Sequence, residues 1–373
     1  MTELSARLKE IDLAILCDVV QKDQDSPSFE IRDWSVKRLS VKGLMHPDGL
    51  WLFSGEGSDG MGVTPWSVVL KIFEQPEDEP PLNNIWHWKR EVYLAQSGLT
   101  ERMPGPVKAP RFFRVDETSD GFWLWMDHVE SHHSRHWVLE DYAFAAHQLG
   151  IWNGAFMKEL PLLTNTWLAR HHYRAFSDSD PADTWSFPLH QKYLSTDTRY
   201  RCERLWAERE MFYHVLETLP QCFTHLDSNR RNLFIRPSLN GKDELAIIDW
   251  ALCGLGPLGA ELYALVGVSS TLSEWPPADL PDLDSAAFES YLQGLGEAGW
   301  SGDIKNARLG YLAWLSMWLG IGLPGWAAWW CAPDNHQAAQ KAGGVGEEEL
   351  YLRLLQILYY VLDCADEARP LMN

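Results

Sequence analysis

The sequence has few cysteines and no paired cysteine motif. Six cysteines are scattered over 373 residues, and no two of them form a CxxC pair. This distribution argues against a structural zinc site and against a disulfide framework. Isolated cysteines are typical of reduced thiols, so we expect a cytoplasmic protein. They lie at Cys17, Cys202, Cys222, Cys253, Cys331 and Cys364.

The chain also lacks an apolar run long enough to span a membrane. The nearest, residues 309–331, is interrupted by four glycines and Pro324, which predicts two helices separated by a break in a folded core. Residues 1–20 have charges among their apolar positions and no small-residue cleavage site, so we expect no secretory signal. Apolar spacings of three and four over residues 3–20 predict an amphipathic helix instead.

Basic residues are outnumbered. The chain has 32 lysines and arginines against 52 aspartates and glutamates, a formal net charge of −20 at pH 7. This balance argues against nucleic-acid binding through a basic surface. An acidic surface favours solubility and would also suit a cationic substrate, and we give solubility more weight. With 46% hydrophobic residues, the chain is long enough to divide into two lobes or domains.

Residues 222–262 carry the strongest chemical pattern. Asp227 is followed five residues later by Asn232, then by an apolar run, a polar turn and a β-like segment that ends in Asp249. Moving a γ-phosphate requires one carboxylate for the proton of the attacking hydroxyl, and an amide and a second carboxylate for Mg²⁺. The three residues fit these roles in that order. The alternative is that they only cap turns or end a strand, as Asp and Asn often do.

The segment HLDSNRRN at residues 225–232, followed by IIDW at residues 247–250, resembles the aminoglycoside phosphotransferase and choline kinase-like family of the protein-kinase-like superfamily. The resemblance covers roughly residues 35–320 and is most specific at residues 225–249. It implies an α+β, two-lobed fold: a small N-lobe with a five-stranded antiparallel sheet plus a helix, and a larger, mainly helical C-lobe. It also implies ATP and Mg²⁺ as cofactors and a small-molecule hydroxyl as the acceptor.

The same plan divides the chain into three parts. Residues 1–33 are expected to form an N-terminal helix and linker, residues 34–128 the nucleotide-binding N-lobe, and residues 129–373 the C-lobe with the catalytic loop and the acceptor site. In this family pattern His225 is a structural residue that braces the loop. Glu261 is similar to an acidic residue that braces the catalytic loop, although a carboxylate at a helix start also interacts favourably with the helix dipole.

One lysine stands inside an apolar strand pattern. Residues 66–73 read as a strand, and an unpaired ammonium at Lys71 would be costly there, so this lysine needs an anionic partner. It is similar to the superfamily lysine that binds the α- and β-phosphates and is steadied by a glutamate on the next helix. Glu91, on a helix expected after Asn83 or Asn84, is the partner we predict. Alternatively, Lys71 extends to water and Glu91 is an exposed helical charge.

The connector between the lobes follows two further strands. Residues 111–116 and 122–126 flank a turn and complete the predicted five strands. In this superfamily the adenine binds connector backbone, which makes Asp127 and Val129 candidate contacts, although an ordinary strand exit would read the same. The turn between the first two strands, where the plan puts the phosphate-covering loop, is glycine-poor. The later glycines at 55, 57, 60 and 62 are interpreted as a flexible connection, so the covering loop stays unassigned.

The rest of the chain predicts helices of the large lobe. We expect them at residues 138–156, 191–218 and 347–364. In the first, the section around Gly150 is similar to a small-molecule kinase segment in which a glycine lets two helices approach closely. Trp314 and Trp318, one turn apart, are interpreted as core residues rather than as a platform for a ligand ring.

The sequence therefore predicts an ATP-dependent phosphotransferase that acts on a hydroxyl of a small molecule. Alternative acceptors are choline or ethanolamine, a macrolide, or a sugar. From a different class, the chain could be a nucleotide-binding regulator without turnover. The acceptor, the choice of ATP or GTP, and the oligomeric state stay open.

Overall fold

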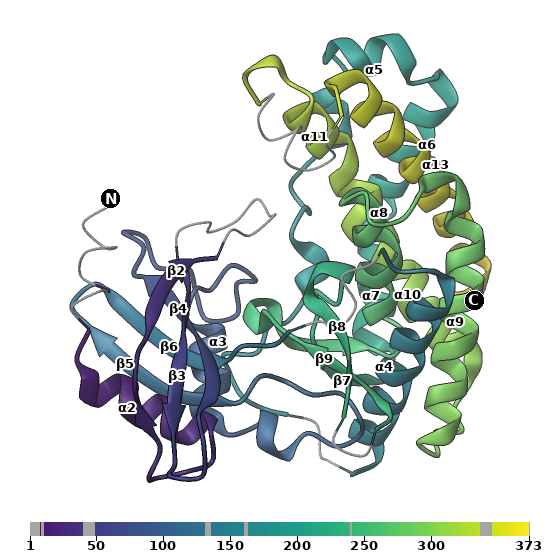
Figure 1. Cartoon of the computed structure of the whole chain (residues 1–373). Coiled ribbons are helices and arrows are strands. Elements are labelled where there is room, and N and C mark those ends of the chain that lie inside the picture. The colour runs from purple at the N-terminus through teal and green to yellow at the C-terminus, as the bar shows by residue number, and fades with distance from the viewer. Residues whose placement is uncertain are drawn as a thin grey trace.

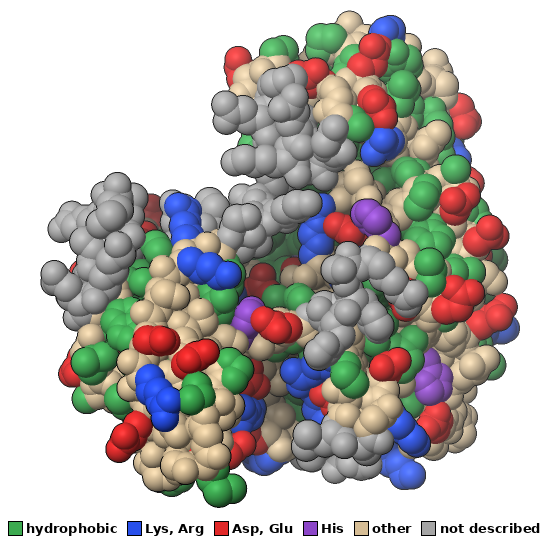
Figure 2. Space-filling model, viewed as in Figure 1, with side chains coloured by type: hydrophobic (Ala, Val, Ile, Leu, Met, Phe, Trp, Pro, Cys, Tyr) green, Lys and Arg blue, Asp and Glu red, His purple; other side chains and the backbone are tan. Residues whose placement is uncertain are grey.

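The computed structural model describes residue 8 and residues 11–39, 49–130, 136–159, 163–238, 241–335 and 345–372. These residues form two lobes (Figure 1). The smaller lobe, purple and blue, is a twisted sheet with helices against it, and the larger lobe, teal to yellow, is mainly helical. Figure 2 shows a hollow between them.

The small-lobe sheet has six strands in the described part of the chain. They pair antiparallel in the order β1-β3-β4-β6-β5, and β2 also pairs with β3. The sequence predicted five strands. The sixth is β1, which has only two residues and is too short to show an alternating pattern. The strands are β1 (Glu30–Ile31), β2 (Ser35–Arg38), β3 (Leu50–Ser58), β4 (Thr64–Glu74), β5 (Phe112–Thr118) and β6 (Gly121–Asp127).

The glycines of β3 correct a second expectation. Gly55 and Gly57 lie inside the strand and not in a flexible connection. A Cβ at Gly55 would come within 2.1 Å of the Asp33 carbonyl oxygen, and one at Gly57 within 2.2 Å of the Phe29 ring. These two glycines therefore let residues 29–33 cross close to β3. The turn between β2 and β3, where the kinase-like plan puts the phosphate-covering loop, falls largely on residues 40–48, outside the described residues.

The sheet is covered by a helix on each face. Helix α2 (Leu13–Asp23), which begins at the cap residue Asp12, packs its buried residues against Val68 and Leu70 of β4. It replaces part of the helix predicted over 3–20, of which residues 3–7, 9 and 10 lie outside the described residues. Because α2 packs on the sheet and β1 belongs to it, we propose to count residues 11–33 with the small lobe.

Helix α3 (Arg90–Ser97) covers the other face, which looks toward the large lobe (Figure 1). Side chains alternate along a strand, so Val69 and Lys71 point to the face opposite Val68 and Leu70. Val69 accordingly packs in a cluster with Ala95 of α3. This alternation places Lys71 on the α3 side of the sheet. The predicted helix is present, but it begins after Lys89 rather than at Asn83 or Asn84.

The large lobe contains the predicted helices with somewhat different bounds. The segment predicted over 191–218 is divided among three helices, because a new helix begins at Thr196 after the cap residue Ser195 and another at Arg209. The α-helices of the described residues in this lobe are α4 (Leu139–Glu159), α5 (Pro188–Tyr193), α6 (Thr196–Ala207), α7 (Arg209–Thr218), the short α8 (Ser269–Thr271), α9 (Leu280–Glu297), α10 (Ile304–Leu315), α11 (Ile321–Trp330) and α13 (Glu347–Leu371).

The glycine-interrupted segment 309–331 is a helix with an irregular middle. Helices α10 and α11 are joined by the π-helical turn Ser316–Gly320, so the predicted break is a local widening of a continuous helix. Pro324 inside α11 has no N–H to donate to the carbonyl oxygen of Gly320, one turn back. The regular α-helical hydrogen bonds are therefore interrupted at the end of the π-helical turn. Among the described residues, every helix is too short or too polar to cross a lipid bilayer.

Helices α4 and α9 pack with almost no gap. A Cβ at Gly150 of α4 would lie 2.2 Å from the Tyr291 carbonyl oxygen, and one at Gly294 of α9 would lie 2.1 Å from the His147 carbonyl oxygen. The predicted close approach at Gly150 is confirmed. The pair is held further by the Tyr291 hydroxyl, which donates to Asn153 Oδ1 at 2.8 Å.

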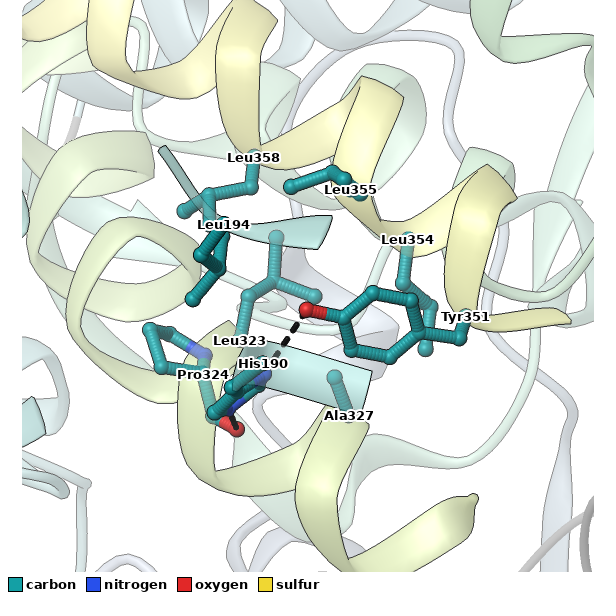
Figure 3. A pocket seen from close by; sticks show the side chains of 9 residues that line it. All are labelled: His190, Leu194, Leu323, Pro324, Ala327, Tyr351, Leu354, Leu355 and Leu358. Carbon is teal, nitrogen blue, oxygen red and sulfur yellow. Dashed lines mark hydrogen bonds between the residues drawn. The ribbon is translucent and has the colours of Figure 1, made fainter. Parts of the chain in front are cut away.

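Two tryptophans of the tail belong to the core. Trp314 is fully buried and Trp318 is 4% exposed, as predicted. Farther along, His190 contacts the Tyr351 hydroxyl at 2.8 Å and the Pro324 carbonyl oxygen at 3.0 Å, beside a cavity of about 10 Å³ (Figure 3). That volume holds about one water molecule, so this cavity does not accommodate an acceptor. The six cysteines are unpaired, and all except Cys17 are buried.

Candidate active site

Two short β pairs of the large lobe position residues 225–249. Strand β7 (Gln221–Thr224) pairs with β10 (Gly254–Pro257), and β8 (Leu233–Pro237) pairs with β9 (Asp243–Ile247). Residues 225–232 form the loop between β7 and β8, and Asp249 follows β9. The Ile248 N–H donates to the Asn232 carbonyl oxygen at 3.0 Å, so the two chemical segments lie side by side.

The Asp227 carboxylate is held by two amides. Asn232 Nδ2 donates to Asp227 Oδ2 at 2.8 Å and to its backbone oxygen at 2.9 Å. Asn229 Nδ2 donates to the other carboxylate oxygen, Oδ1, at 2.8 Å. Each carboxylate oxygen thus has one amide partner, which fixes the orientation of the group. Sequence reasoning missed Asn229.

The environment of Asp227 opposes its ionisation. Burial, and then the negative charge of Asp249, raise the pKa of Asp227 to about 7. The amide hydrogen bonds from Asn229 and Asn232 act in the opposite direction. A carboxylate with a pKa near the working pH suits a group that takes up a proton.

The side-chain oxygen of Asn232, Oδ1, accepts no hydrogen bond from the described residues. Its Nδ2 faces two acceptors of Asp227, so the amide nitrogen must lie on that side. No hydrogen bond to Asn232 Oδ1 is found among the described residues. This leaves a hard oxygen ligand beside Asp249, which fits Mg²⁺. No group of three His, Cys, Asp or Glu side chains among the described residues could hold a metal ion. In proteins Mg²⁺ is commonly bound by one or two carboxylates together with substrate phosphates and water.

Asp249 occupies an unusual backbone conformation. Its φ and ψ are 63° and 66°, the left-handed region, and it begins the turn Trp250–Leu252. Its side chain is 46% exposed, and Oδ1 accepts from Lys71 Nζ at 2.7 Å. A strained aspartate at the end of a strand is held by its surroundings, and here those include the lysine of the small lobe.

Lys71 and Glu91 form the predicted pair. Lys71 Nζ donates to Glu91 Oε2 at 2.5 Å, and the Glu91 side chain is 1% exposed. Burial alone lowers the pKa of Lys71, but Asp249 and Glu91 outweigh it and raise the pKa above its ordinary value. The other oxygen of Glu91 accepts from the Trp250 N–H at 3.1 Å. Glu91 therefore connects the lysine to the turn that follows Asp249.

His225 and Glu261 make the predicted bracing contacts with the loop of residues 225–232. His225 Nδ1 accepts from the Asp227 N–H at 3.2 Å, so its proton lies on Nε2, which donates to the Ile248 carbonyl oxygen at 3.1 Å. Burial lowers the pKa of His225 to about 4, so the ring is neutral near pH 7. Glu261 accepts from the His225 N–H at 2.5 Å and from Ser228 Oγ at 2.6 Å.

The connector residues are less informative. The Asp127 carboxylate accepts from the Arg111 N–H at 2.8 Å and from its Nε at 3.1 Å. The Asp127 N–H donates to the Arg111 carbonyl oxygen at 3.0 Å, so this donor is already used. Val129 is partly exposed. Adenine binding by Asp127 and Val129 stays a prediction, and residues 131–135 of the connector lie outside the described residues.

Comparisons with known proteins show the family and the fold of this chain. Residues 63–301 match the family described as the phosphotransferase enzyme family. No curated protein matches the sequence. Among solved structures, the chain is similar to the microcompartment-associated aminopropanol kinase, with 10% identity, 96% of this chain and 98% of that chain covered, and a TM-score of 0.55.

Two further structures are similar. An aminoglycoside phosphotransferase from Alicyclobacillus acidocaldarius has 14% identity, with 89% of this chain and 93% of that chain covered and a TM-score of 0.55. The GDP complex of aminoglycoside 2'-phosphotransferase-IIIa has 12% identity, with 94% and 98% covered and a TM-score of 0.51. At identities this low, structural similarity shows the fold alone. The similarity confirms the predicted α+β, two-lobed, protein-kinase-like fold.

Proposed function

Since this chain belongs to the phosphotransferase enzyme family, we propose that it transfers the γ-phosphate of ATP, with Mg²⁺, to a hydroxyl group of a small molecule. The observation that carries the proposal is that Asn229 and Asn232 each donate a hydrogen bond to the Asp227 carboxylate, while Lys71 is hydrogen-bonded to Asp249. Free thiols further support a cytoplasmic location.

Each side chain has a distinct role in this proposal. Asp227 orients the acceptor hydroxyl and takes up its proton. The side-chain oxygen of Asn232 and the carboxylate of Asp249 would hold Mg²⁺, which when bound would neutralise phosphate charge as it develops. Lys71 leaves Asp249 for the α- and β-phosphates when nucleotide binds, and Glu91 keeps the ammonium oriented.

The acceptor is best sought with a panel. The three similar structures described above are named for enzymes that act on aminopropanol or aminoglycosides, and a net charge of −20 suits cationic acceptors. Amino alcohols and aminoglycosides therefore come first, followed by choline, ethanolamine, macrolides and sugars. ATP and GTP are both tried as donors. Nucleotide binding without turnover on any acceptor would favour the inactive regulator.

The direct test is Asp227→Ala. Loss of the base is expected to lower kcat by about 10²- to 10⁴-fold, while the affinity for Mg·ATP changes little. Asp243→Ala, an exposed aspartate of β9, is the matched control and should leave both quantities unchanged. Lost nucleotide affinity with turnover preserved would contradict the assigned role.

A further inference from the structure

Arg90, the first residue of α3, is a fully buried arginine whose guanidinium is completely satisfied by backbone. An arginine side chain has five N–H donors, and here five carbonyl oxygens accept from it. Nε donates to Trp167; Nη1 donates to Ile85 and Ala251; Nη2 donates to Asn84 and Leu82. The donor–acceptor distances run from 2.5 Å at Asn84 to 3.4 Å at Leu82.

No acidic side chain of the described residues pairs with Arg90, which separates it from an ordinary buried ion pair. A buried cation is costly unless polar groups replace its water, and here the carbonyl dipoles do so. A lysine could not reproduce the arrangement, because its three donors radiate from one nitrogen and cannot reach carbonyls spread around a planar guanidinium.

The five carbonyls come from three separate chain segments. Leu82, Asn84 and Ile85 belong to the loop before α3, Trp167 belongs to the large lobe, and Ala251 lies in the turn directly after Asp249. Arg90 therefore ties α3 to the large lobe and to the segment that carries the proposed metal ligand.

The next residue on α3 contacts the same turn. Glu91 accepts from the Trp250 N–H and from Lys71, so Arg90 and Glu91 hold two consecutive residues, Trp250 and Ala251, from one helix end. In this turn the Trp250 N–H donates to Glu91, and the Ala251 carbonyl oxygen accepts from Arg90. This two-point attachment fixes both the distance and the rotation of the turn relative to α3.

We infer that Arg90 is a positioning residue that keeps α3 docked on the turn after Asp249, so that Lys71, Glu91 and Asp249 are assembled before nucleotide binds. The inference rests on the proposed function for its kinetic consequence. On this inference, Glu91 already contacts Lys71 in the nucleotide-free protein, and no movement of α3 is needed to bring the two side chains together.

The kinetic test compares Arg90→Lys with Arg308→Lys. Arg308 of α10 is also largely buried, at 17% side-chain exposure, and its partners are Asp284 and Glu367. Arg90→Lys is expected to lower kcat by about 10- to 100-fold, since hydrogen bonds to a charged group are lost at the site. It should also raise the Mg²⁺ concentration that gives half-maximal rate. Arg308→Lys should lower the thermal midpoint with kcat and Mg²⁺ dependence unchanged. An Arg90→Lys enzyme that is less stable but has wild-type kcat and Mg²⁺ dependence overturns the inference.

A second measurement uses the wild-type chain, in case Arg90→Lys does not fold. Without nucleotide, the amides of α3 and the Trp250 amide are expected to exchange with deuterium slowly and together, because they open as one unit. If α3 exchanges rapidly in the free protein and becomes protected only with Mg·ATP, the inference is wrong. This result does not depend on turnover, so it stands apart from a failure to find any acceptor, which would count against the proposed function alone.

Discussion

Asn229 and Asn232 both hold Asp227, but only one of them has an oxygen left for a metal. Asn229 Oδ1 accepts from the Arg231 N–H at 3.0 Å and caps the short turn that follows, whereas Asn232 Oδ1 has no protein donor among the described residues. Both amides therefore orient the Asp227 carboxylate, whereas the proposed binding of Mg²⁺ belongs to Asn232 alone.

This division predicts different kinetic effects for two alanine variants. Asn229→Ala should lower kcat by about tenfold, since one hydrogen bond to a charged group is lost, without changing the Mg²⁺ requirement. Asn232→Ala should lower kcat further and raise the Mg²⁺ concentration that gives half-maximal rate. Initial rates over a Mg²⁺ series distinguish them. An equal rise of the Mg²⁺ requirement in both variants would refute the assignment.

Glu261 gives a prediction on pH. Burial raises the pKa of Glu261 from 4.5 to about 7 in the folded protein. Between these values the unfolded chain releases a proton that the folded chain keeps, so the contribution of Glu261 to the free energy of unfolding falls as pH rises, by at most roughly 3 kcal/mol. Glu261→Gln, which is neutral at every pH, should therefore gain stability relative to wild type between pH 5 and pH 8.

Urea unfolding at several pH values measures this difference. Glu117→Gln, an exposed carboxyl on β5, controls for the loss of one charge. A stability difference between wild type and Glu261→Gln that does not change from pH 5 to pH 8 would show that Glu261 is ionised in the folded protein throughout this range.

At this scale the sequence predicted contacts between side chains better than contacts to backbone. Lys71 with Glu91, and Asp227 with Asn232, were predicted to converge because each pair needs specific chemical types, and these contacts are present. Their roles in turnover stay predictions. Arg90 was not singled out, because its partners are carbonyl oxygens, which every residue has and no sequence pattern reports.

Among the elements, the contact of α4 with α9 depends on glycine. Gly150→Ala should lower the free energy of unfolding by about 1–3 kcal/mol, because the new methyl group forces the two helices apart. Gly296→Ala is the matched control on α9, where a Cβ meets nothing within 4 Å. There alanine should stabilise the protein by about 0.5–1 kcal/mol through its helix propensity. Equal destabilisation by both substitutions in urea unfolding would argue against close packing as the cause.

Elements with a long periodic pattern could be predicted from sequence, and short or irregular ones could not. Strand β4 and helix α4 are long, so their runs of apolar residues are visible in the sequence. Strand β1 exists only because β3 provides a partner. The π-helical turn Ser316–Gly320 depends on how bonding is completed before Pro324, which a hydrophobic period does not encode.

At the scale of the whole molecule, backbone and side-chain hydrogen bonds join the two lobes in addition to the connector. Lys108, just before β5, donates its N–H to the Leu245 carbonyl oxygen at 2.9 Å and accepts from the Ile247 N–H at 2.8 Å. Together with Arg90 on the Trp167 and Ala251 carbonyl oxygens, this pairing fixes the small lobe to the β8–β9 hairpin. A nucleotide bound between the lobes would add a further link.

Mg·ATP should therefore stabilise the whole chain. Binding to the folded state alone adds about 2.7 kcal/mol to the free energy of unfolding at a hundredfold excess over Kd. Asp249→Asn should reduce this gain in the presence of Mg²⁺, while Asp334→Asn, a substitution outside the site, should not. Thermal unfolding with and without Mg·ATP measures it. Equal gains in wild type and Asp249→Asn would count against Asp249 as a metal ligand.

The distribution of thiols has a practical consequence. Burial raises the pKa of Cys202, Cys222, Cys253, Cys331 and Cys364, and these five are shielded from reagents. Cys17 is only partly covered, and it lies on α2, across the sheet from α3. A maleimide fluorophore can therefore be attached to the native enzyme at a single position, which gives an optical reporter of the outer helix without any engineered cysteine.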